Sequence, residues 1–259
     1  MTTALVTGAG KRLGRAMALA LAEQGYDVAV HYGQSADAAE TTAKDIRALG
    51  RRAVTLRADL TAEDDMQRLV PAATDALGAP LTCLINNASI FEYDNIQSAT
   101  RDSWDRHFES NLRAPFVLTQ AMAEQAPEPE LDDNGEPVAQ AIVINMIDQR
   151  VRKLTPEFMT YTLAKSALWA LTRTSAQALA PKLRVNAIGP GPTLVGARQS
   201  EDHFAQQRAA TILSRGANAS DVTGALVYLL TARSVTGQLI CTDGGQHLGW
   251  KTPDIVGLE

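Results

Sequence analysis

The stretch Thr7-Gly8-Ala9-Gly10-Lys11-Arg12-Leu13-Gly14 decides the fold. It follows a short β-rich run, residues 3–6, and it opens an amphipathic stretch that extends to about Gln24. Glycines at a strand-to-helix turn let backbone N–H groups approach a pyrophosphate, and the helix N-terminus adds a favourable dipole. The stretch therefore predicts a dinucleotide-binding turn, with a purely structural turn as the alternative. The residues expected to contact the cofactor here are Gly8, Gly10, Arg12, Leu13 and Gly14.

The glycine spacing departs from the common G-x-G-x-x-G pattern. Gly8, Gly10 and Gly14 are present, whereas Arg12 occupies a place where a further glycine often lies. A guanidinium group can bind a phosphate with two parallel hydrogen bonds. Arg12 is therefore a candidate both for cofactor binding and for contact with the substrate.

Short apolar runs alternate with helical stretches along the rest of the chain. The predicted strands are residues 3–6, 27–31, 53–57, 81–85, 141–146, 183–188 and 239–242. The predicted helices end near Gln24, cover residues 35–49, 101–125, 158–179 and 220–230, and include one that runs from an N-cap at Thr61 to about Gly78. Near-continuous apolar strands separated by helices are typical of a parallel sheet that is covered on both faces. We expect one α/β domain over residues 1–259, a Rossmann-type doubly wound parallel sheet of about seven strands with helices on both faces.

Two segments interrupt this alternation. Residues 126–139 are acidic and rich in proline, so they are expected to form a surface loop. Residues 189–219 follow the sixth predicted strand at the carboxyl edge of the sheet, where ligands bind in this fold class. The second segment is therefore predicted to be a lid over the substrate, the alternative being a connecting loop.

Composition excludes several classes of protein. Lys and Arg number 24 and Asp and Glu 29 in the 259 residues, a net charge of −5, and no long basic run indicates nucleic-acid binding. The longest apolar runs fall short of the ~20 residues that span a bilayer, and the N-terminus lacks the features of a signal peptide. The two cysteines, Cys83 and Cys241, lie in predicted buried strands and are expected to be core residues. We expect a cytoplasmic protein with no metal site, no nucleic-acid partner and no membrane contact.

The end of the second predicted strand indicates the cofactor. It reads His31-Tyr32-Gly33-Gln34-Ser35, without the acidic residue that binds the ribose 2′-OH in NAD enzymes. Ser35 and the backbone after His31 can donate to a 2′-phosphate, and Arg12 supplies positive charge nearby. The sequence therefore favours NADP(H) over NAD(H), with His31, Tyr32 and Ser35 in the cofactor site.

A tyrosine and a lysine provide the candidate acid–base chemistry. Tyr161 and Lys165 are four residues apart and so share one face of a predicted helix. An ammonium group beside a phenol lowers its pKa, which makes the tyrosine a better general acid. A surface pair is the alternative.

This pair and several further motifs resemble the short-chain dehydrogenase/reductase superfamily, from Leu5 to Gly245. The motifs that carry the resemblance are Asp59-Leu60, Asn86-Asn87-Ala88-Ser89, Asn111, Pro190-Gly191 and Thr242-Asp243-Gly244-Gly245. The resemblance implies roles for them. Asp59, with Leu60, would contact the adenine, and Asn86, Asn87 and Ala88 would lie along the ribose and the nicotinamide. Pro190-Gly191 would contact the carboxamide.

The resemblance also implies a proton path and an assembly. Lys165 would bond the nicotinamide ribose, and Asn111 would hold a water that links Lys165 to bulk solvent. A homotetramer is implied, with the helices around residues 103–123 and 158–179 as its faces.

One position departs from most of that superfamily. Asp148 stands thirteen residues before Tyr161, where most members carry a serine that polarises a carbonyl. A carboxylate would repel the developing oxyanion of a ketone reduction. An aspartic acid could instead donate a proton or bind an amino–imine edge, and loss of activity is the alternative.

Arg12, His31-Tyr32 with Ser35, and Asp148 together resemble the pteridine reductases, including the dihydromonapterin reductase branch. Asn87-Ala88-Ser89-Ile90-Phe91 extends this resemblance. It implies that Phe91 stacks on a flat pterin, with loop packing as the alternative, and that Ser89 bonds a cofactor phosphate or the pterin edge.

The sequence thus predicts NADPH-dependent reduction of a pteridine, either a dihydropterin or a dihydrofolate. The predicted catalytic residues are Tyr161, Lys165, Asp148 and Asn111. The predicted substrate-binding residues are Arg12, Ser89, Phe91, Asp148 and Tyr161. The alternatives are a carbonyl reductase of the same fold, acting on a ketone or sugar, and a non-catalytic NADP-sensing module. The intact Asn111, Tyr161 and Lys165 set argues against sensing.

Overall fold

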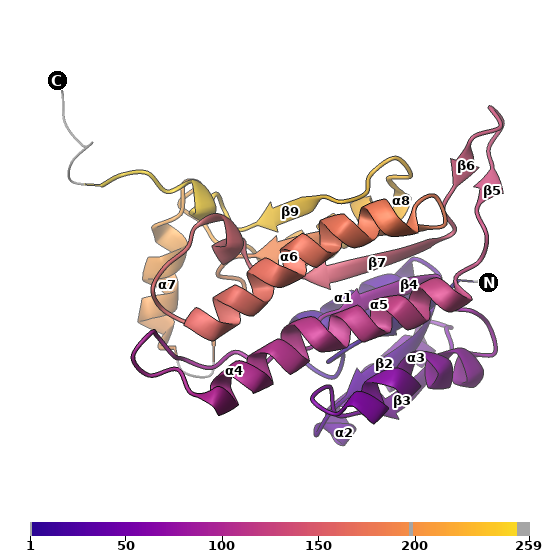
Figure 1. Ribbon diagram of the computed structural model, residues 1–259, viewed down its shortest axis with the longest axis horizontal. Helices are drawn as coiled ribbons and strands as arrows, with labels where there is room; N and C mark the ends of the chain where they lie inside the picture. The colour runs from indigo at the N-terminus through magenta and orange to yellow at the C-terminus, as the bar shows by residue number, and fades with distance from the viewer. Residues whose placement is uncertain (1, 197–198, 253–259) are drawn as a thin grey trace.

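A parallel sheet lies at the centre of the computed structural model, which describes residues 2–196 and 199–252 (Figure 1). Its seven strands in this described part follow the order β3-β2-β1-β4-β7-β8-β9, and all neighbouring pairs are parallel. They are β1 (Thr3–Val6), β2 (Asp27–Tyr32), β3 (Ala53–Arg57), β4 (Cys83–Asn86), β7 (Ala141–Met146), β8 (Leu183–Pro190) and β9 (Leu239–Thr242). The predicted doubly wound Rossmann-type sheet is confirmed.

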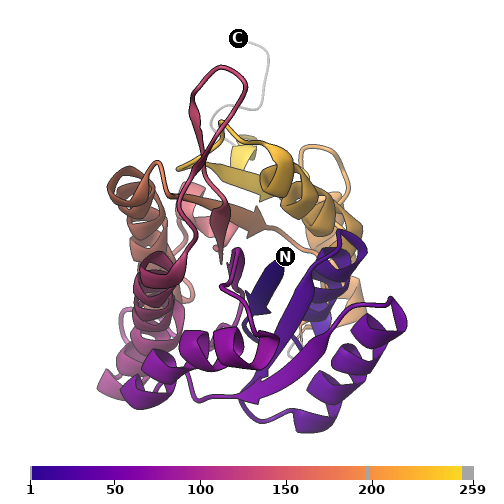
Figure 2. The same ribbon diagram turned by 90° about the vertical axis from the view of Figure 1, so that its right-hand side faces the viewer.

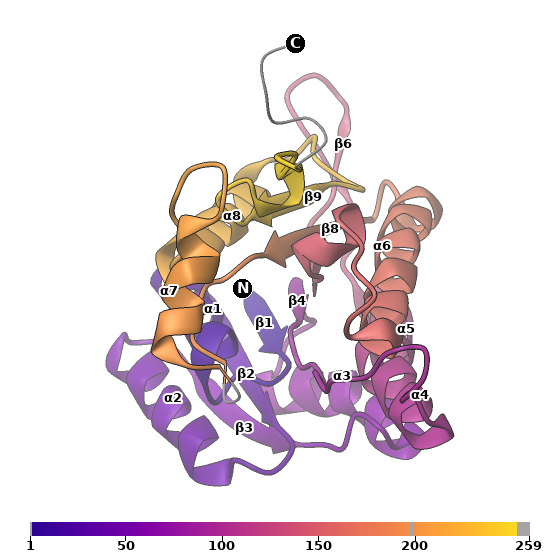
Figure 3. The same cartoon turned by 90° about the vertical axis from the view of Figure 1, so that its left-hand side faces the viewer.

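Helices cover both faces of this sheet (Figures 2 and 3). On one face are α1 (Arg12–Glu23), α2 (Ala36–Ala48) and α8 (Ala219–Thr231), and on the other are α3 (Glu63–Leu77), α5 (Ala114–Gln125) and α6 (Met159–Leu179). Successive side chains of a strand point to opposite faces. Ala4 and Val6 therefore enter the core that includes α1, whereas Leu5 enters the core that includes α3 and α5. Burial on both faces explains why the strands are apolar throughout.

The predicted helix over residues 101–125 is interrupted by a π-helical turn. α4 (Arg101–Phe108) leads into this turn, Glu109–Arg113, and α5 follows it. Pro115 has no N–H and cannot donate to the carbonyl of Asn111, so the regular ladder fails here. Ala114 instead donates to Glu109, five residues back. Such turns are frequent at functional sites, and Asn111 lies within this one.

The predicted N-cap of α3 is wrong. The helix begins at Glu63 after Ala62, and Thr61 lies outside it. The Thr61 hydroxyl and N–H both donate to Asp59 Oδ1, at 2.7 Å and 2.9 Å. This local turn uses both hydrogen-bond donors of Thr61 before the helix starts. Three acidic residues in the first turn of α3 instead place negative charge at the helix N-terminus, where it is stabilising.

The two irregular segments contain structure that the sequence pattern did not reveal. Residues 126–139 include a two-stranded hairpin, β5 (Glu130–Leu131) and β6 (Pro137–Val138), which projects from the end of the molecule opposite the carboxyl edge (Figure 1). The predicted lid contains α7 (Glu201–Ala209), which lies at the carboxyl edge (Figure 3). Residues 197–198 of that lid, and Met1 and residues 253–259 of the predicted domain, lie outside the described residues.

The side-chain environments of the cysteines differ. Cys83 is buried, as expected, whereas Cys241 is only partly buried, because β9 lies at the edge of the sheet. No helix in the described part of the chain is both long enough and apolar enough to cross a membrane.

Candidate active site

The phosphate loop lies between β1 and α1 at the carboxyl edge, and close backbone packing explains its glycines. Gly8 has a φ of +63°, and a Cβ added to Gly14 would lie 2.2 Å from the Gly8 carbonyl oxygen. The first turn of α1 contains no acidic residue, and its N-cap, Lys11, makes no side-chain cap bond. A helix N-terminus of this kind fits the pyrophosphate of a dinucleotide.

Arg12 adopts a backbone conformation that usually favours glycine, with a φ of +54°. Its guanidinium donates to the carbonyls of Val195 and Leu194, at 2.7 Å and 3.2 Å. The structure therefore places Arg12 between the phosphate loop and the segment after β8. Contact of Arg12 with a phosphate stays a prediction.

Two polar side chains, His31 and Asn87, hold the backbone of this loop. The Gly8 N–H donates to His31 Nδ1 at 3.0 Å, while His31 Nε2 lies 3.1 Å from the Ala58 carbonyl. Asn87 Nδ2 donates to the Thr7 carbonyl at 2.8 Å. His31 is 2 % exposed, so its ring acts chiefly by holding Gly8 in place.

Asn86 does not lie where the resemblance put it. Its side chain donates to Asn145 Oδ1 at 2.8 Å across β4 and β7, and it is buried. It therefore braces the interior of the sheet, because the last residue of β4 still points into the core.

A cavity of about 290 Å³ extends from the phosphate loop toward β3. Of the predicted cofactor residues it brings together Gly8, His31, Asp59, Leu60, Ala88 and Ser89. Tyr32 and Ser35 are not among its lining residues. Hydrogen bonds from Thr61 hold the pKa of Asp59 below its usual range, so Asp59 is an ionised acceptor in this cavity.

Arg57 lines the same cavity and was not predicted from the sequence. It is the last residue of β3, and it is the one lysine or arginine among the lining residues that are described. It could have been predicted from its position two residues before Asp59, which was itself predicted to contact the cofactor.

The candidate proton donors meet at the carboxyl end of β7. The Tyr161 hydroxyl donates to Asp148 Oδ2 at 3.1 Å, and Lys165 Nζ donates to the Met146 carbonyl at 2.8 Å. Lys165 Nζ lies 5.8 Å from the centroid of the Tyr161 ring. One turn of α6 separates the two residues, so the helix presents both to the same edge, as the spacing predicted.

Burial dominates the electrostatics of this group. It raises the pKa of Asp148 and lowers the pKa of Lys165 to about 8. Burial, and then Asp148, raise the pKa of Tyr161 well above its usual 10.0. The expectation of a lowered Tyr161 pKa is therefore wrong for this structure, because burial and the acidic neighbour outweigh the Arg150 guanidinium, which lowers it. A raised Asp148 pKa favours the neutral carboxylic acid, which can donate a proton.

A second cavity, of about 230 Å³, lies between Asp148 and the segment after β8. It is lined by the predicted residues Arg12, Leu13, Phe91, Asp148, Pro190 and Gly191. Ser89 lies instead on the first cavity. The structure thus separates Ser89 from Arg12, Phe91 and Asp148, and Tyr161 is not among the described lining residues of either cavity.

Aromatic packing fixes the position of Phe91. Its ring stacks on Phe158 with centroids 4.4 Å apart, and it meets the Tyr161 ring edge-on at 4.7 Å. The Arg150 guanidinium lies 4.9 Å from the centroid of the Phe158 ring. Phe91 is 45 % exposed, so part of the ring faces solvent beside the tyrosine.

Gln149 is a further lining residue that the sequence did not reveal. Its side chain is 6 % exposed, and its Oε1 has no hydrogen-bond partner among the described residues. Its position directly after Asp148 was the available signal. No group of three or more metal-ligating side chains occurs in the described ranges.

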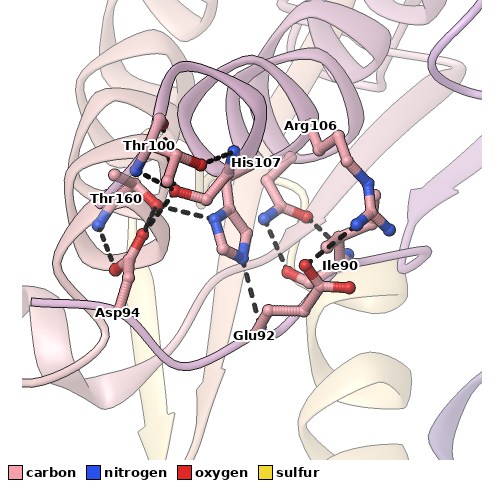
Figure 4. Close-up of polar contacts among 9 residues, drawn as sticks. Ile90, Glu92, Asp94, Thr100, Arg106, His107 and Thr160 are labelled. Atoms are coloured by element: carbon pink, nitrogen blue, oxygen red, sulfur yellow. Dashed lines mark hydrogen bonds and ion pairs between the residues drawn. The ribbon is translucent and has the colours of Figure 1, made fainter. Parts of the chain in front are cut away.

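Asn111, in the π-helical turn, binds the backbone next to Phe91 (Figure 4). Its Oδ1 accepts from the Ile90 N–H at 3.1 Å, and its Nδ2 donates to the Ile90 carbonyl at 2.9 Å. The water link from Asn111 to Lys165 stays a prediction.

Residues 8–247 match the model of a family described as enoyl-(acyl carrier protein) reductase. The chain belongs to the short-chain dehydrogenase/reductase superfamily. It is therefore an oxidoreductase of that superfamily, and the predicted resemblance is confirmed.

Solved and curated members of this superfamily are similar over nearly their whole length. The solved structure of FolM alternative dihydrofolate reductase 1 from Brucella suis in complex with NADP is 43% identical, with a TM-score of 0.90 over 98% of both chains. Pteridine reductase 1 of Leishmania tarentolae is 30% identical, over 95% of this chain and 96% of its own. The 3-oxoacyl-[acyl-carrier-protein] reductase FabG of Staphylococcus epidermidis is 29% identical, over 95% and 99%. The similarity thus extends to members that are named for different substrates.

Proposed function

We propose that this chain is an NADPH-dependent reductase of a pteridine, a dihydropterin or a dihydrofolate. One observation carries the proposal: a mostly buried Asp148 carboxyl group lies 3.1 Å from the Tyr161 hydroxyl and lines the cavity beside Phe91. Burial raises its pKa, so it keeps its proton to a higher pH than a free aspartic acid does, which suits a ring nitrogen that must gain a proton. The FolM and pteridine reductase names of two similar proteins support this choice of substrate.

NADP(H) is the cofactor in this proposal. The N-terminus of α1 would hold the pyrophosphate, and Asp59 would contact the adenine in the cavity near β3. Arg57 lines that cavity and would pair with the 2′-phosphate. When bound, the reduced nicotinamide supplies a hydride. The Brucella suis neighbour, solved with NADP, supports this assignment.

Reduction of a C=N bond needs one hydride and one proton, and this chain's residues supply the proton. Tyr161 holds a phenolic proton at all moderate pH values, because its pKa is raised. Asp148 is hydrogen-bonded to that hydroxyl and can restore its proton or donate directly. Lys165 is fixed by the Met146 carbonyl and places its ammonium beside the tyrosine ring.

The cavity also suits a flat heteroaromatic ring. Such a ring needs one aromatic face and a few polar groups at its edge. Phe91 supplies the face, while Asp148, Gln149 and Arg12 line the edge. A ketone is a poorer fit because it presents neither a flat ring to Phe91 nor a nitrogen-bearing edge to Asp148.

A substrate panel tests the proposal. NADPH oxidation by the purified protein is followed with dihydrobiopterin, dihydrofolate and a set of ketones, including an acetoacetyl thioester. We expect kcat/KM for at least one pteridine to exceed that for every ketone by at least about tenfold. Faster turnover of a ketone would identify a carbonyl reductase, and tight NADPH binding without any turnover would identify a sensing module.

We also propose that the protein is a homotetramer. Large apolar side chains are exposed on α4, α5 and α6, namely Trp104, Phe116 and Leu163. These helices lie next to one another on one face of the sheet (Figure 3). Exposed apolar patches of this kind are typical of subunit interfaces.

A further inference from the structure

The segment that carries Phe91 has no regular secondary structure, yet its backbone is held on both sides of that residue (Figure 4). Asn111 makes two hydrogen bonds to Ile90, and the Glu92 N–H donates to His107 Nε2 at 3.1 Å. His107 and Asn111 are four residues apart, and both make hydrogen bonds to this segment. The backbone on both sides of Phe91 is therefore held by two side chains from one helical face.

The other nitrogen of His107 continues the chain of contacts. His107 Nδ1 lies 2.7 Å from Thr160 Oγ1, and the Thr160 hydroxyl donates to Asp94 Oδ2 at 2.5 Å. Ser103, at the start of α4, donates to the same carboxylate oxygen at 3.0 Å. His107, Thr160 and Asp94 are almost completely buried, at 0 %, 1 % and 2 % exposed. Polar contacts in such a site are strong, and leaving one unmade is costly.

The hydrogen-bond pattern fixes the protonation of His107. The Glu92 N–H can only donate, so Nε2 must be an acceptor and carries no hydrogen. The Thr160 hydroxyl uses its hydrogen on Asp94, so Nδ1 must be the donor to Thr160. Burial lowers the pKa of His107, which agrees with a neutral ring protonated on Nδ1.

Asp94 also caps the helix that carries the tyrosine. The N-cap of α6, Phe158, has a φ of +55° and makes no side-chain cap bond, and the first turn contains no acidic residue. Asp94 takes that place from another segment, because its carbonyl accepts from Met159 N at 3.2 Å and its Oδ1 accepts from Thr160 N at 3.0 Å. An anion at a helix N-terminus is stabilising. Tyr161 is the next residue along α6.

We propose that His107, Thr160 and Asp94 are positioning residues that set the distance between Phe91 and Tyr161. The network joins the backbone next to Phe91 to the helix turn that holds Tyr161, and none of its three members lines the substrate cavity. It would thereby hold a flat substrate ring at the proton donor. The inference that this distance governs substrate affinity rests on the proposed function.

Two Thr160 variants test the network by kinetics. Thr160→Val keeps the shape of the side chain but removes the hydroxyl, whereas Thr160→Ser keeps the hydroxyl. We expect Thr160→Val to raise KM for the preferred pteridine about fivefold to tenfold, the range for losing one buried hydrogen bond. The Kd for NADPH should change less than about twofold, and Thr160→Ser should restore most of the KM.

Thr119→Val is the matched control. Thr119 is a buried threonine on α5 whose hydroxyl donates to Pro115 within its own helix. Its loss removes a buried hydroxyl outside the network and should leave KM unchanged. The proposal is overturned if the two valine variants have the same KM, or if Thr160→Ser is as impaired as Thr160→Val.

A second measurement needs no substrate. Nitrogen NMR of the imidazole rings should show His107 as the neutral Nδ1–H form at neutral pH. The Glu92 amide should exchange slowly, and this protection should be lost in His107→Asn but largely kept in His107→Gln, whose amide oxygen can reach the Nε2 position. A His107 protonated on Nε2, or a fast-exchanging Glu92 amide, would disprove the network. If both results are as expected but no pteridine is reduced, the network stands and the proposed function fails.

Discussion

At the scale of single residues, the decisive feature is the mostly buried carboxyl group of Asp148, which is hydrogen-bonded to the Tyr161 hydroxyl. Burial raises the pKa of Asp148 and of Tyr161, whose hydroxyl lies 3.1 Å from Asp148 Oδ2, and Asp148 raises the pKa of Tyr161 further. Each group therefore keeps its proton to a higher pH than the free side chain does, which suits proton donation. A serine in place of the aspartate would leave a neutral donor but no second proton to give.

Replacing Asp148 by serine should separate two activities. We expect Asp148→Ser to lower kcat/KM for the pteridine about 10²-fold, the lower end of what a general acid contributes. Turnover of ketones should rise, because a hydroxyl can stabilise the oxyanion that a carboxylate repels. Steady-state kinetics on both substrates provides the comparison, with NADPH affinity as the control for folding. Unchanged pteridine turnover would remove Asp148 from the mechanism.

Lys165 should set the upper limit of the pH range. Burial lowers its pKa to about 8, so the ammonium is present below that pH and is lost above it. Tyr161 remains a phenol over the same range because its pKa is raised. We therefore expect kcat/KM for NADPH, which reports ionisations of the free enzyme, to fall as the pH rises through about 8. The ionised Asp148 carboxylate raises the pKa of Lys165, so Asp148→Asn should move this limb to lower pH, and a limb that moves upward would contradict the assignment.

Arg57 should determine the preference for the phosphorylated cofactor. It is the cation in the described lining of the cavity near β3. Arg57→Gln keeps a polar side chain but removes the charge, so the Kd for NADPH should rise about tenfold, as expected for a lost charge-assisted bond. The Kd for NADH should change less than about twofold. Fluorescence titration with both cofactors decides the point, and equal losses for the two would mean that Arg57 does not contact the 2′-phosphate.

At the scale of elements, the site joins a helix, a π-helical turn and an irregular segment. The motif in the phosphate loop and the spacing of Tyr161 and Lys165 were readable because each lies within one element. The contacts of Asn111 and Asp94 were not, since they connect residues that are distant in sequence through the backbone. Pro115 was the one local signal for the π-helical turn. Its meaning is clear only from the missing N–H, which would otherwise donate to the carbonyl of Asn111.

The segment that carries Phe91 should act on the substrate rather than on the fold. In Phe91→Ala, KM for the pteridine should rise several-fold, because an aromatic stack contributes ~0.5–1.5 kcal/mol beyond burial. Phe91→Tyr keeps the ring and should be close to wild type. NADPH affinity should be little altered, since Phe91 does not line the cofactor cavity. If the melting temperature falls while the pteridine KM holds, Phe91 serves mainly to pack on Phe158.

At the scale of the whole molecule, the sequence predicted the order of strands and helices well. The periodicity of apolar residues and the turn residues between them specify such elements locally, as β1 and the loop after it illustrate. The short helix α7 was missed because it has no apolar periodicity and none of its residues is buried. The hairpin of β5 and β6 was missed because two-residue strands leave no periodic pattern.

The exposed apolar face of α4, α5 and α6 leads to a prediction about how the protein assembles. We expect light scattering to give a mass about four times the 27.7 kDa of one chain. Leu163 is 43 % exposed on α6, two residues after Tyr161, so Leu163→Arg would place a charge in an apolar interface and should reduce the mass to that of a dimer or monomer. Leu49→Arg is the control, because Leu49 is similarly exposed at 47 % but follows α2 on the opposite face. A wild-type monomer, or a tetramer that withstands Leu163→Arg, would show that this face is not the interface. Loss of activity together with the mass would further indicate that neighbouring subunits hold α6, and with it Tyr161, in place.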